Sequence, residues 1–189
     1  MKFEAIVRTY IRNIRPRAQS EIDWFARQPS LDDAIEKAAL AVNSRGKRYS
    51  HQRRLTKTAL KQALRALRDK SEAMEEARDF DELFKIVHTA VEPITGIGEL
   101  YIYDTSFRIG AKLNIFPTKV YLHAGTRRGV RALGLDASGA TLKVSALPKE
   151  FRALEPHEME DALCIFKDKF KSASSVPMAG DIGKRSWCG

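Results

Sequence analysis

The sequence predicts a mainly α-helical, compact fold with a helix–hairpin–helix element. Apolar residues recur every three to four positions along most of the chain, which is the period of an α-helix. No alternation of strand and helix patterns is visible, and a glycine-containing segment, Ile94–Gly98, separates two helical patterns. With 189 residues, the chain is long enough to bury a sizeable core. We expect one helical domain over 1–172, or two lobes over about 1–92 and 93–172, with a C-terminal tail over 173–189.

Three helices are predicted before the glycine segment. Residues 30–42 open with a serine that can cap a helix and with acids in the first turn. Ser50 is the expected cap of the second helix, and either Asp79 or Asp81 starts the third, which Pro93 ends. Their expected inward faces are apolar and consist of Leu31, Ile35, Ala38, Ala39 and Val42, then Leu55, Ala59, Leu60, Leu64 and Leu67, then Leu83, Ile86, Val87 and Val91.

Six elements are predicted after the glycine segment, one of which is a helix that could start at Pro148. We expect a helix over 99–112, a short helix from Pro117 to Leu122, and another helix over 126–135. Residues 141–147 are expected to form one short strand or extended segment, and 156–170 a further helix. This last helix is expected to bury Met159, Leu163, Phe166 and either Cys164 or Ile165.

The charge is large and unevenly distributed. The net charge is +9, and ten basic residues lie between Asn43 and Lys70 beside one acid, Asp69. From Ser71 to Glu99 the balance reverses, with eight acids beside Arg78 and Lys85. Such a polarised chain favours a polyanion as partner, or alternatively an acidic protein bound by a helical adaptor.

Several classes of protein are not expected. The chain has no run of eighteen apolar residues, and its N-terminus lacks a signal-peptide core. Cys164 and Cys188 suit a reduced cytoplasm and cannot by themselves build a disulfide framework or a four-cysteine metal site. His157 and Glu160 lack the second cluster that a metal site needs. We therefore expect a cytoplasmic monomer with no metal and no cofactor.

The segment Ile94–Gly98 is the first candidate for function. Its glycines, Gly96 and Gly98, flank one apolar residue directly before a predicted helix, where backbone N–H groups can approach an anion closely. A helix, this turn and a second helix form a helix–hairpin–helix pattern, which would bind DNA phosphates without reading sequence. The alternative is a glycine-rich connection in an ordinary helical bundle.

Asp104 is the candidate catalytic group. On a helix it shares a mostly apolar face with Leu100, Phe107 and Ala111. A carboxylate there is either paired or has a function, because burying it unpaired costs several kcal/mol. Arg108, four residues on, offers a structural ion pair as the alternative to a catalytic role. Tyr101 and Tyr103 flank the aspartate and are either base-stacking groups or core aromatics.

These residues resemble the helix–hairpin–helix DNA glycosylase superfamily. Residues 94–98 are similar to that family's Leu-Pro-Gly-Ile-Gly hairpin, and 103–108 to its Val-Asp-Thr-His-Val-x-Arg segment, whose aspartate is catalytic. The similarity covers about twenty residues, and only five residues separate Gly98 from Asp104, whereas the family has well over a dozen there. The family's lyase lysine corresponds to Leu100, which implies a monofunctional glycosylase.

The resemblance implies a mechanism. A damaged or modified base would leave the stack and enter a pocket formed by Tyr101, Tyr103, His123 and Arg108. Asp104 would stabilise the oxocarbenium character of the sugar and orient water as the N-glycosidic bond breaks. Members of the superfamily serve base repair, and some related bacterial proteins excise modified phage bases as a defence. The sequence leaves both roles open.

Residues 120–134 are a second candidate hairpin. Gly125 would form the turn, Thr126 would open the helix, and Arg127 and Arg128 would hold phosphates. Asp136 would then be the alternative catalytic carboxylate. A helix–turn–helix corner with a solvated basic face is the structural alternative. His123 is a base, a stacking partner, a pocket wall or a structural residue.

Arg53 and Lys57 complete the expected DNA track. They lie in the basic block, near Ser50 and Gln52, where a side chain can wedge into or read DNA or simply face solvent. A non-enzymatic helical DNA- or RNA-binding protein would show the same charge and the same hairpin. In that case Asp104 would matter only for stability.

Overall fold

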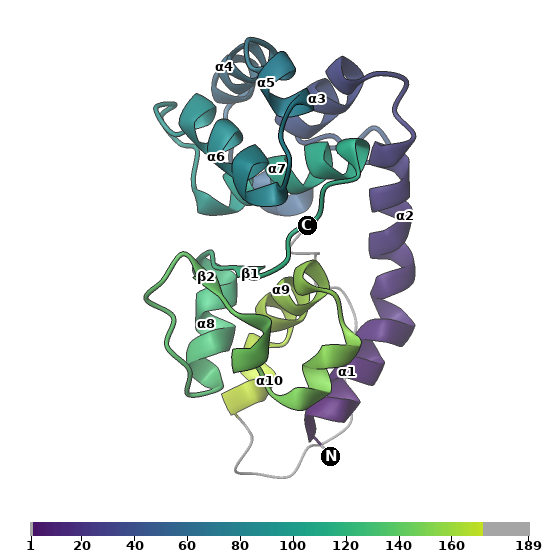
Figure 1. The fold of residues 1–189 in the computed structure, drawn as a ribbon, viewed down its shortest axis with the longest axis vertical. Coiled ribbons are helices and arrows are strands. Elements are labelled where there is room, and N and C mark those ends of the chain that lie inside the picture. The colour runs from purple at the N-terminus through teal and green to yellow at the C-terminus, as the bar shows by residue number, and fades with distance from the viewer. Residues whose placement is uncertain (1, 172–189) are drawn as a thin grey trace. The chain divides into compact units, whose positions relative to one another are not determined.

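The computed structural model describes residues 2–171, which are mainly helical and fall into two compact units (Figure 1). Unit 1 comprises Met1–Pro16 and Thr118–Gly189, and unit 2 comprises Arg17–Pro117. Each unit has its own hydrophobic core. Within the described range, every helix is either too short or too polar to span a bilayer.

This division differs from the predicted domain organisation. The sequence predicted one domain over 1–172 or a break near 92–93, whereas the chain crosses between units at 16–17 and again at 117–118. The physical reason is packing. The apolar face of α1 (Lys2–Asn13) lies in the core of unit 1, and the helices before and after residue 93 pack against each other inside unit 2.

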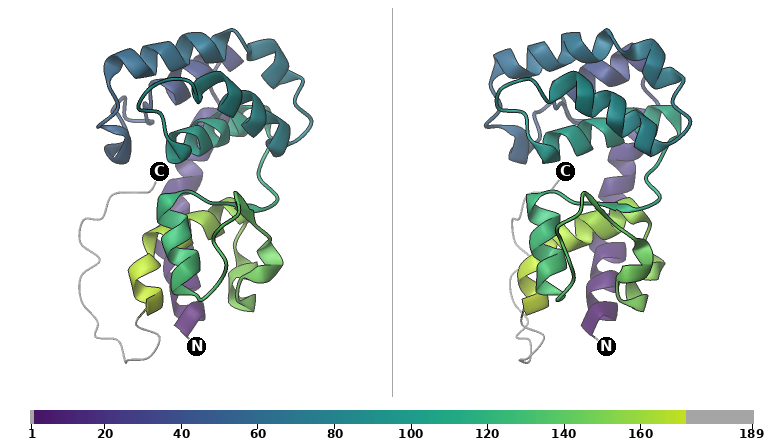
Figure 2. Two further views of the ribbon diagram at one scale, coloured as in Figure 1. Left: turned by 90° about the vertical axis from the view of Figure 1, so that its left-hand side faces the viewer. Right: turned by 60° about the vertical axis from the view of Figure 1, so that its left-hand side comes forward.

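Unit 2 is a cluster of short helices around α7. Helix α4 packs on both α3 and α6, and α7 packs on the same two helices (Figure 2). The unit contains most of α2 (Arg15–Ala26), then α3 (Leu31–Ala39), the 3₁₀ turn η1 (Ser50–Gln52), α4 (Lys57–Arg68), α5 (Ser71–Glu75), α6 (Phe80–Val91) and α7 (Glu99–Leu113).

Helix caps account for most of these boundaries. The side chains of Ser30 and Asp79 accept backbone N–H groups at the starts of α3 and α6, which confirms the predicted cap of the first helix and decides between Asp79 and Asp81. Ser50 as cap of the next helix was wrong, because Thr56 caps α4 and residues 50–52 form η1 instead. The first helix also ends earlier than predicted, since Ala41 has a φ of 55°.

The turn that ends α7 depends on a glycine. A Cβ atom at Gly110 would collide with the carbonyl oxygen of Ile115 and lie 3.4 Å from a methyl carbon of Leu83. A larger residue would therefore disturb the turn after α7, in which the N–H of Ile115 donates to the carbonyl of Gly110 at 2.8 Å.

Unit 1 packs α1 with the C-terminal part of the chain. The two short strands pair antiparallel, with Val120 opposite Leu142 and Tyr121 opposite Thr141. Buried aromatic and aliphatic residues of α1, η3 and α9 fill the core. After α1, the elements are β1 (Val120–Tyr121), α8 (Ala124–Ala132), β2 (Thr141–Leu142), the 3₁₀ turns η2 (Val144–Ala146) and η3 (Lys149–Ala153), α9 (Pro156–Ile165) and α10 (Lys167–Lys171).

Four predictions for this unit needed correction. The helix expected over 126–135 begins at Ala124, with His123 rather than Thr126 at its start, and ends at Ala132. The short helix from Pro117 to Leu122 is instead strand β1, because long-range pairing with β2 satisfies the backbone there. The extended segment over 141–147 is confirmed only for its first two residues. The helix over 156–170 is divided into α9 and α10 at Phe166, and Cys164, rather than Ile165, is buried.

Candidate functional site

The connection between α6 and α7 is an exposed turn anchored by two isoleucines. The N–H of Ile97 donates to the carbonyl of Ile94 at 3.1 Å, and Gly96 between them has a φ of 92°, which favours glycine. Both isoleucines pack on the core of unit 2. Gly96 and Gly98 are exposed, and a Cβ atom at either position would meet nothing within 4 Å. The backbone is therefore open to approach from outside.

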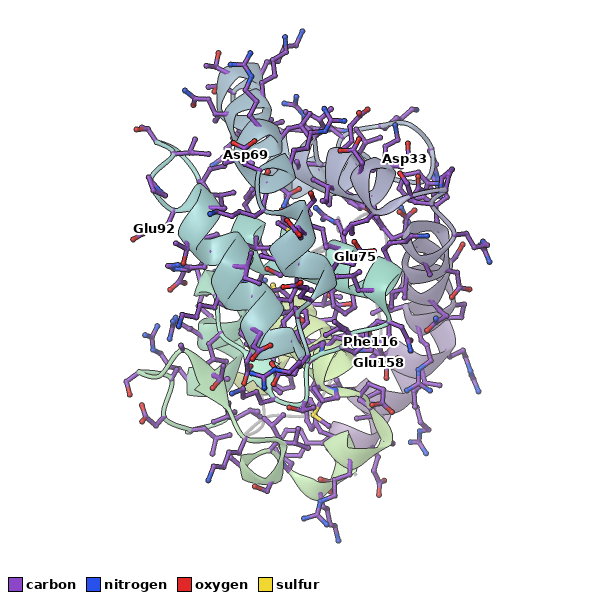
Figure 3. All side chains as sticks on the ribbon, turned by 45° about the horizontal axis from the view of Figure 1, so that its top comes forward. Asp33, Asp69, Glu75, Glu92, Phe116 and Glu158 are labelled. Atoms are coloured by element: carbon purple, nitrogen blue, oxygen red, sulfur yellow. The ribbon has the colours of Figure 1, made fainter. Side chains whose placement is uncertain are left out.

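The turn leads into an uncapped helix N-terminus. Gly98 is the N-cap of α7 and provides no side chain to accept the first-turn N–H groups. These groups and the helix dipole favour an anion. Two acids lie close by in the chain: Glu99 in the first turn and the exposed Glu92, which Figure 3 labels beyond the end of α6. They oppose a phosphate, so the turn alone is a weak anion site.

A stronger positive feature precedes it in the chain. Residues 43–68 contain no acid, and α4 presents Lys57, Lys61 and Arg65 at intervals of four residues, so they lie along one helix face about 6 Å apart. All three are exposed. Asp69, at the C-terminus of α4, is the first acid to follow them (Figure 3).

Most of the cations between residues 43 and 68 have no side-chain partner among the residues that the structure describes. Arg68 pairs with Asp32 and Glu36 of α3, and Arg48 donates to the carbonyl of Leu55. Seven others are exposed and make no side-chain hydrogen bond or ion pair with any residue in the described part of the chain. We call these seven the cationic surface: Arg45, Lys47, Arg53, Arg54, Lys57, Lys61 and Arg65.

Asp104 lies inside unit 2, not at its surface. Its side chain is 7% exposed, and its Oδ2 accepts three hydrogen bonds, from His51 Nε2 at 2.7 Å, Gln52 Nε2 at 2.8 Å and Arg108 at 3.1 Å. The partners come from η1 and from the next turn of α7. The predicted ion pair with Arg108 is therefore present, and His51 and Gln52 of η1 add two hydrogen bonds to the same carboxylate oxygen.

Arg108 completes this buried cluster. Its guanidinium, 6% exposed, also donates to Gln52 Oε1 at 3.0 Å and lies 3.9 Å from the ring centre of Tyr49. A buried guanidinium is tolerated only with such charge and hydrogen-bond compensation. We call His51, Gln52, Asp104 and Arg108 the Asp104 cluster.

The surroundings of the other predicted pocket residues indicate structural roles. Tyr101 is buried and donates to the carbonyl of Ala39 at 2.8 Å, and its burial raises the pKa of the phenol. Tyr103 is buried too, with its ring stacked on Phe107. His123 belongs to unit 1, where it is 2% exposed. Of the four residues predicted to line a pocket, Tyr101, Tyr103 and Arg108 are buried in unit 2 and His123 is buried in unit 1.

His123 anchors a second buried polar cluster, in unit 1. The N–H of Gly125 donates to His123 Nδ1 at 3.2 Å, so the proton is on Nε2, which donates to Glu160. Thr126 Oγ1 donates to the same Glu160 oxygen at 2.7 Å. Gly125 lies against the side chain of Cys164. This arrangement caps α8 from inside and leaves Gly125 and Thr126 facing the protein.

Two arginines of α8 and Asp136 also make contacts within unit 1. Arg127 donates to the carbonyls of Ala137 and Gly139, and Arg128 pairs with Asp168. Asp136 is exposed and accepts the N–H and hydroxyl of Ser138, and these bonds lower the pKa of its carboxyl. The second candidate hairpin is thus held by contacts within unit 1.

Sequence reasoning missed the inward role of His51 and Gln52. The segment 50–54 was interpreted as either a DNA-contacting wedge or a solvated helix face, and the structure divides it. His51 and Gln52 point toward Asp104, whereas Arg53 and Arg54 are exposed. The available signal was the position of two polar, non-cationic residues in the middle of a basic run.

Comparison of the chain with models of protein families, with curated proteins and with solved structures found no match. The function is therefore argued from the site itself.

The buried pair leads to a stability prediction. Replacing Asp104 with alanine should lower the free energy of unfolding by about 3–5 kcal/mol, because Arg108 would remain buried without its counter-charge. The double variant Asp104→Leu with Arg108→Met should recover most of this loss, and chemical denaturation measures both. The control is Arg78→Ala, which breaks another i,i+4 ion pair, the one with Glu82. Because Arg78 is exposed, this variant should change the free energy of unfolding little. Equal losses at the two sites would contradict the prediction.

Proposed function

We propose that this protein binds DNA through its phosphate backbone, with the cationic surface of unit 2 as the main contact. The observation that carries the proposal is that seven exposed cations lie in one stretch of chain without an acid, and none is neutralised by the described part of the chain. Repulsion among unpaired like charges has a cost in the free protein. A polyanion removes that cost.

The spacing of the cations suits a phosphate backbone. A row of Lys57, Lys61 and Arg65 repeats about every 6 Å along α4, so successive side chains can each reach a different phosphate of one strand. Lysine and arginine bound to phosphates release condensed counterions, which supplies affinity that is independent of base sequence. Binding should therefore be strong at low salt and should not depend on sequence.

The turn at 94–98 would add a positioning contact. We propose that the turn with α6 and α7 acts as a helix–hairpin–helix element, whose open N–H groups at Gly96, Gly98 and the first turn of α7 face one phosphate. Because Glu92 and Glu99 are near, this contact orients the DNA and contributes less affinity than the cationic surface.

Binding without catalysis is the function that the geometry supports best. Asp104 is buried and shares one carboxylate oxygen among three donors, and Asp136 is exposed and bonded to Ser138. Both carboxylates have a sufficient structural role. The alternative preferred ligands are RNA and an acidic protein, and binding measurements would distinguish either of them from DNA.

Base excision is the second candidate. The observation that favours it is that the three hydrogen bonds of Asp104 all go to Oδ2, so that Oδ1 makes none with the described residues. A monofunctional glycosylase of the family that residues 94–108 resemble would use that oxygen to orient water and stabilise the oxocarbenium. A modified base would be its substrate, in repair or in defence against phage.

The main proposal predicts a salt dependence. Changing Lys57, Lys61 and Arg65 to glutamine should weaken duplex binding and should reduce the slope of log K against log salt by about 2.7, since each lost phosphate contact removes about 0.9. Fluorescence anisotropy with labelled duplexes at several salt concentrations measures this. The control removes the same charge from unit 1, by changing Arg8, Arg12 and Arg152 to glutamine, and should alter the slope less. A wild-type slope near zero would exclude DNA.

The turn predicts a second, separable effect. Gly98→Val should weaken DNA binding several-fold while the fold is retained, because the backbone at Gly98 is extended with a φ of −128° and the space around its Cβ position is open. The valine side chain would cover the N–H groups of α7. Circular dichroism and anisotropy together test it. Unchanged affinity in the folded variant would remove the turn from the interface.

The two candidates predict different products. If binding is the function, incubation with duplexes carrying a broad panel of modified bases, followed by alkali, should give no strand breaks above background. If excision is the function, the wild type should produce abasic sites and Asp104→Asn should lose at least a hundredfold in rate while still binding DNA. Breaks that persist unchanged in Asp104→Asn would exclude Asp104 as the catalytic carboxylate.

A further inference from the structure

We infer that Asp104 is the positioning residue that fixes the irregular part of the cationic surface, residues 43–54. The inference rests on the proposed DNA binding and names the interaction that holds the binding segment in shape. Four of the seven exposed cations, Arg45, Lys47, Arg53 and Arg54, lie outside α4 in this segment. Their geometry cannot come from a helix, so it depends on what anchors the segment.

The first half of the segment is anchored to α2. Glu21 accepts the N–H of Ser44 at 3.1 Å, the hydroxyl of Ser44, and the phenol of Tyr49 at 2.8 Å. Burial raises the pKa of Tyr49, so the phenol keeps its proton and donates. Within the turn, Asn43 Oδ1 accepts the N–H groups of Arg45 and Lys47. The backbone on either side of Gly46 is thereby closed into a loop.

The second half is anchored to α7 through the Asp104 cluster. His51 and Gln52 donate to one oxygen of Asp104, Gln52 also accepts from Arg108, and the guanidinium of Arg108 lies over the ring of Tyr49. Arg53 follows directly after these two anchored residues. Because residues 51 and 52 face inward, the next two side chains of the turn are presented to solvent.

A neutral amide cannot replace this carboxylate. Three donors converge on Oδ2 in a site with little access to water. Asparagine can place its carbonyl oxygen at the position of Oδ2, but it loses the negative charge that balances Arg108 and that strengthens the three hydrogen bonds to this oxygen. The expected result is release of η1 from α7, with α4 and its three cations unaffected, because Thr56 caps that helix independently.

The experiment compares Asp104→Asn with Leu83→Ala, a core variant in α6 that destabilises unit 2 without touching the cluster. Limited trypsin digestion without DNA, followed by mass spectrometry, reports cleavage after Arg45, Lys47, Arg53 and Arg54. We expect Asp104→Asn to cleave at Arg53 and Arg54 at least tenfold faster than Leu83→Ala under the same native conditions. In DNA titrations its salt slope should fall by about 2, for two lost phosphate contacts.

A second variant keeps the test independent of folding. His51→Ala removes one anchor at the edge of the cluster and leaves the Asp104–Arg108 pair in place, so it should show the same cleavage pattern more weakly. Protection of Arg53 and Arg54 in both variants, equal to that of the wild type, would overturn the inference. If the wild type does not bind DNA while Asp104→Asn still releases the segment, the positioning role stands and the proposed function fails.

Discussion

Unit 2 depends on the compensation of one buried cation. Arg108 sits on the inward face of α7 and would be strongly destabilising without a counter-charge. Asp104, one turn earlier, supplies that charge, and the stacking on Tyr49 and the bond to Gln52 satisfy much of the remaining guanidinium. Arg108 and these three partners come from two segments about fifty residues apart in sequence, so the contacts also close a long loop and join the basic segment to α7.

This arrangement separates charges by environment. Arg108, which pairs with Asp104, is buried, while the seven cations of the cationic surface, which have no side-chain partner within residues 2–171, are exposed. The acids after residue 70 do not neutralise the cationic surface. Asp79 caps α6 and Glu82 pairs with Arg78. Glu75 and Glu92 are exposed on other elements (Figure 3). No acid lies within residues 43–68, the stretch that carries the seven cations of the cationic surface. The uneven distribution of charge seen in the sequence therefore persists in the folded unit. The positive segment is exposed and is held from inside by the Asp104 cluster.

Local signals allowed much of the fold to be predicted. The caps at Ser30 and Asp79, the helix from residue 99 and the Asp104–Arg108 pair all depend on neighbours within four residues, and each is present. What failed depended on distant partners. Strand β1 exists because residues 141–142 pair with it, and α1 joins unit 1 because its apolar face fits a core built from residues after 118. The inward direction of His51 and Gln52 is likewise set by a helix fifty residues away.

The same dependence explains why Asp104 was ambiguous in the sequence. An aspartate on an apolar helix face, with arginine four residues on, is equally the pattern of a catalytic carboxylate and of a structural pair. Donors from elsewhere in the chain distinguish the two. When three of them converge on one oxygen, the carboxylate holds its surroundings in place, and a reaction would have to proceed from the other oxygen without disturbing that network. A role in shaping the segment that we propose to contact DNA uses the network as it stands, and for this reason we rank binding ahead of excision.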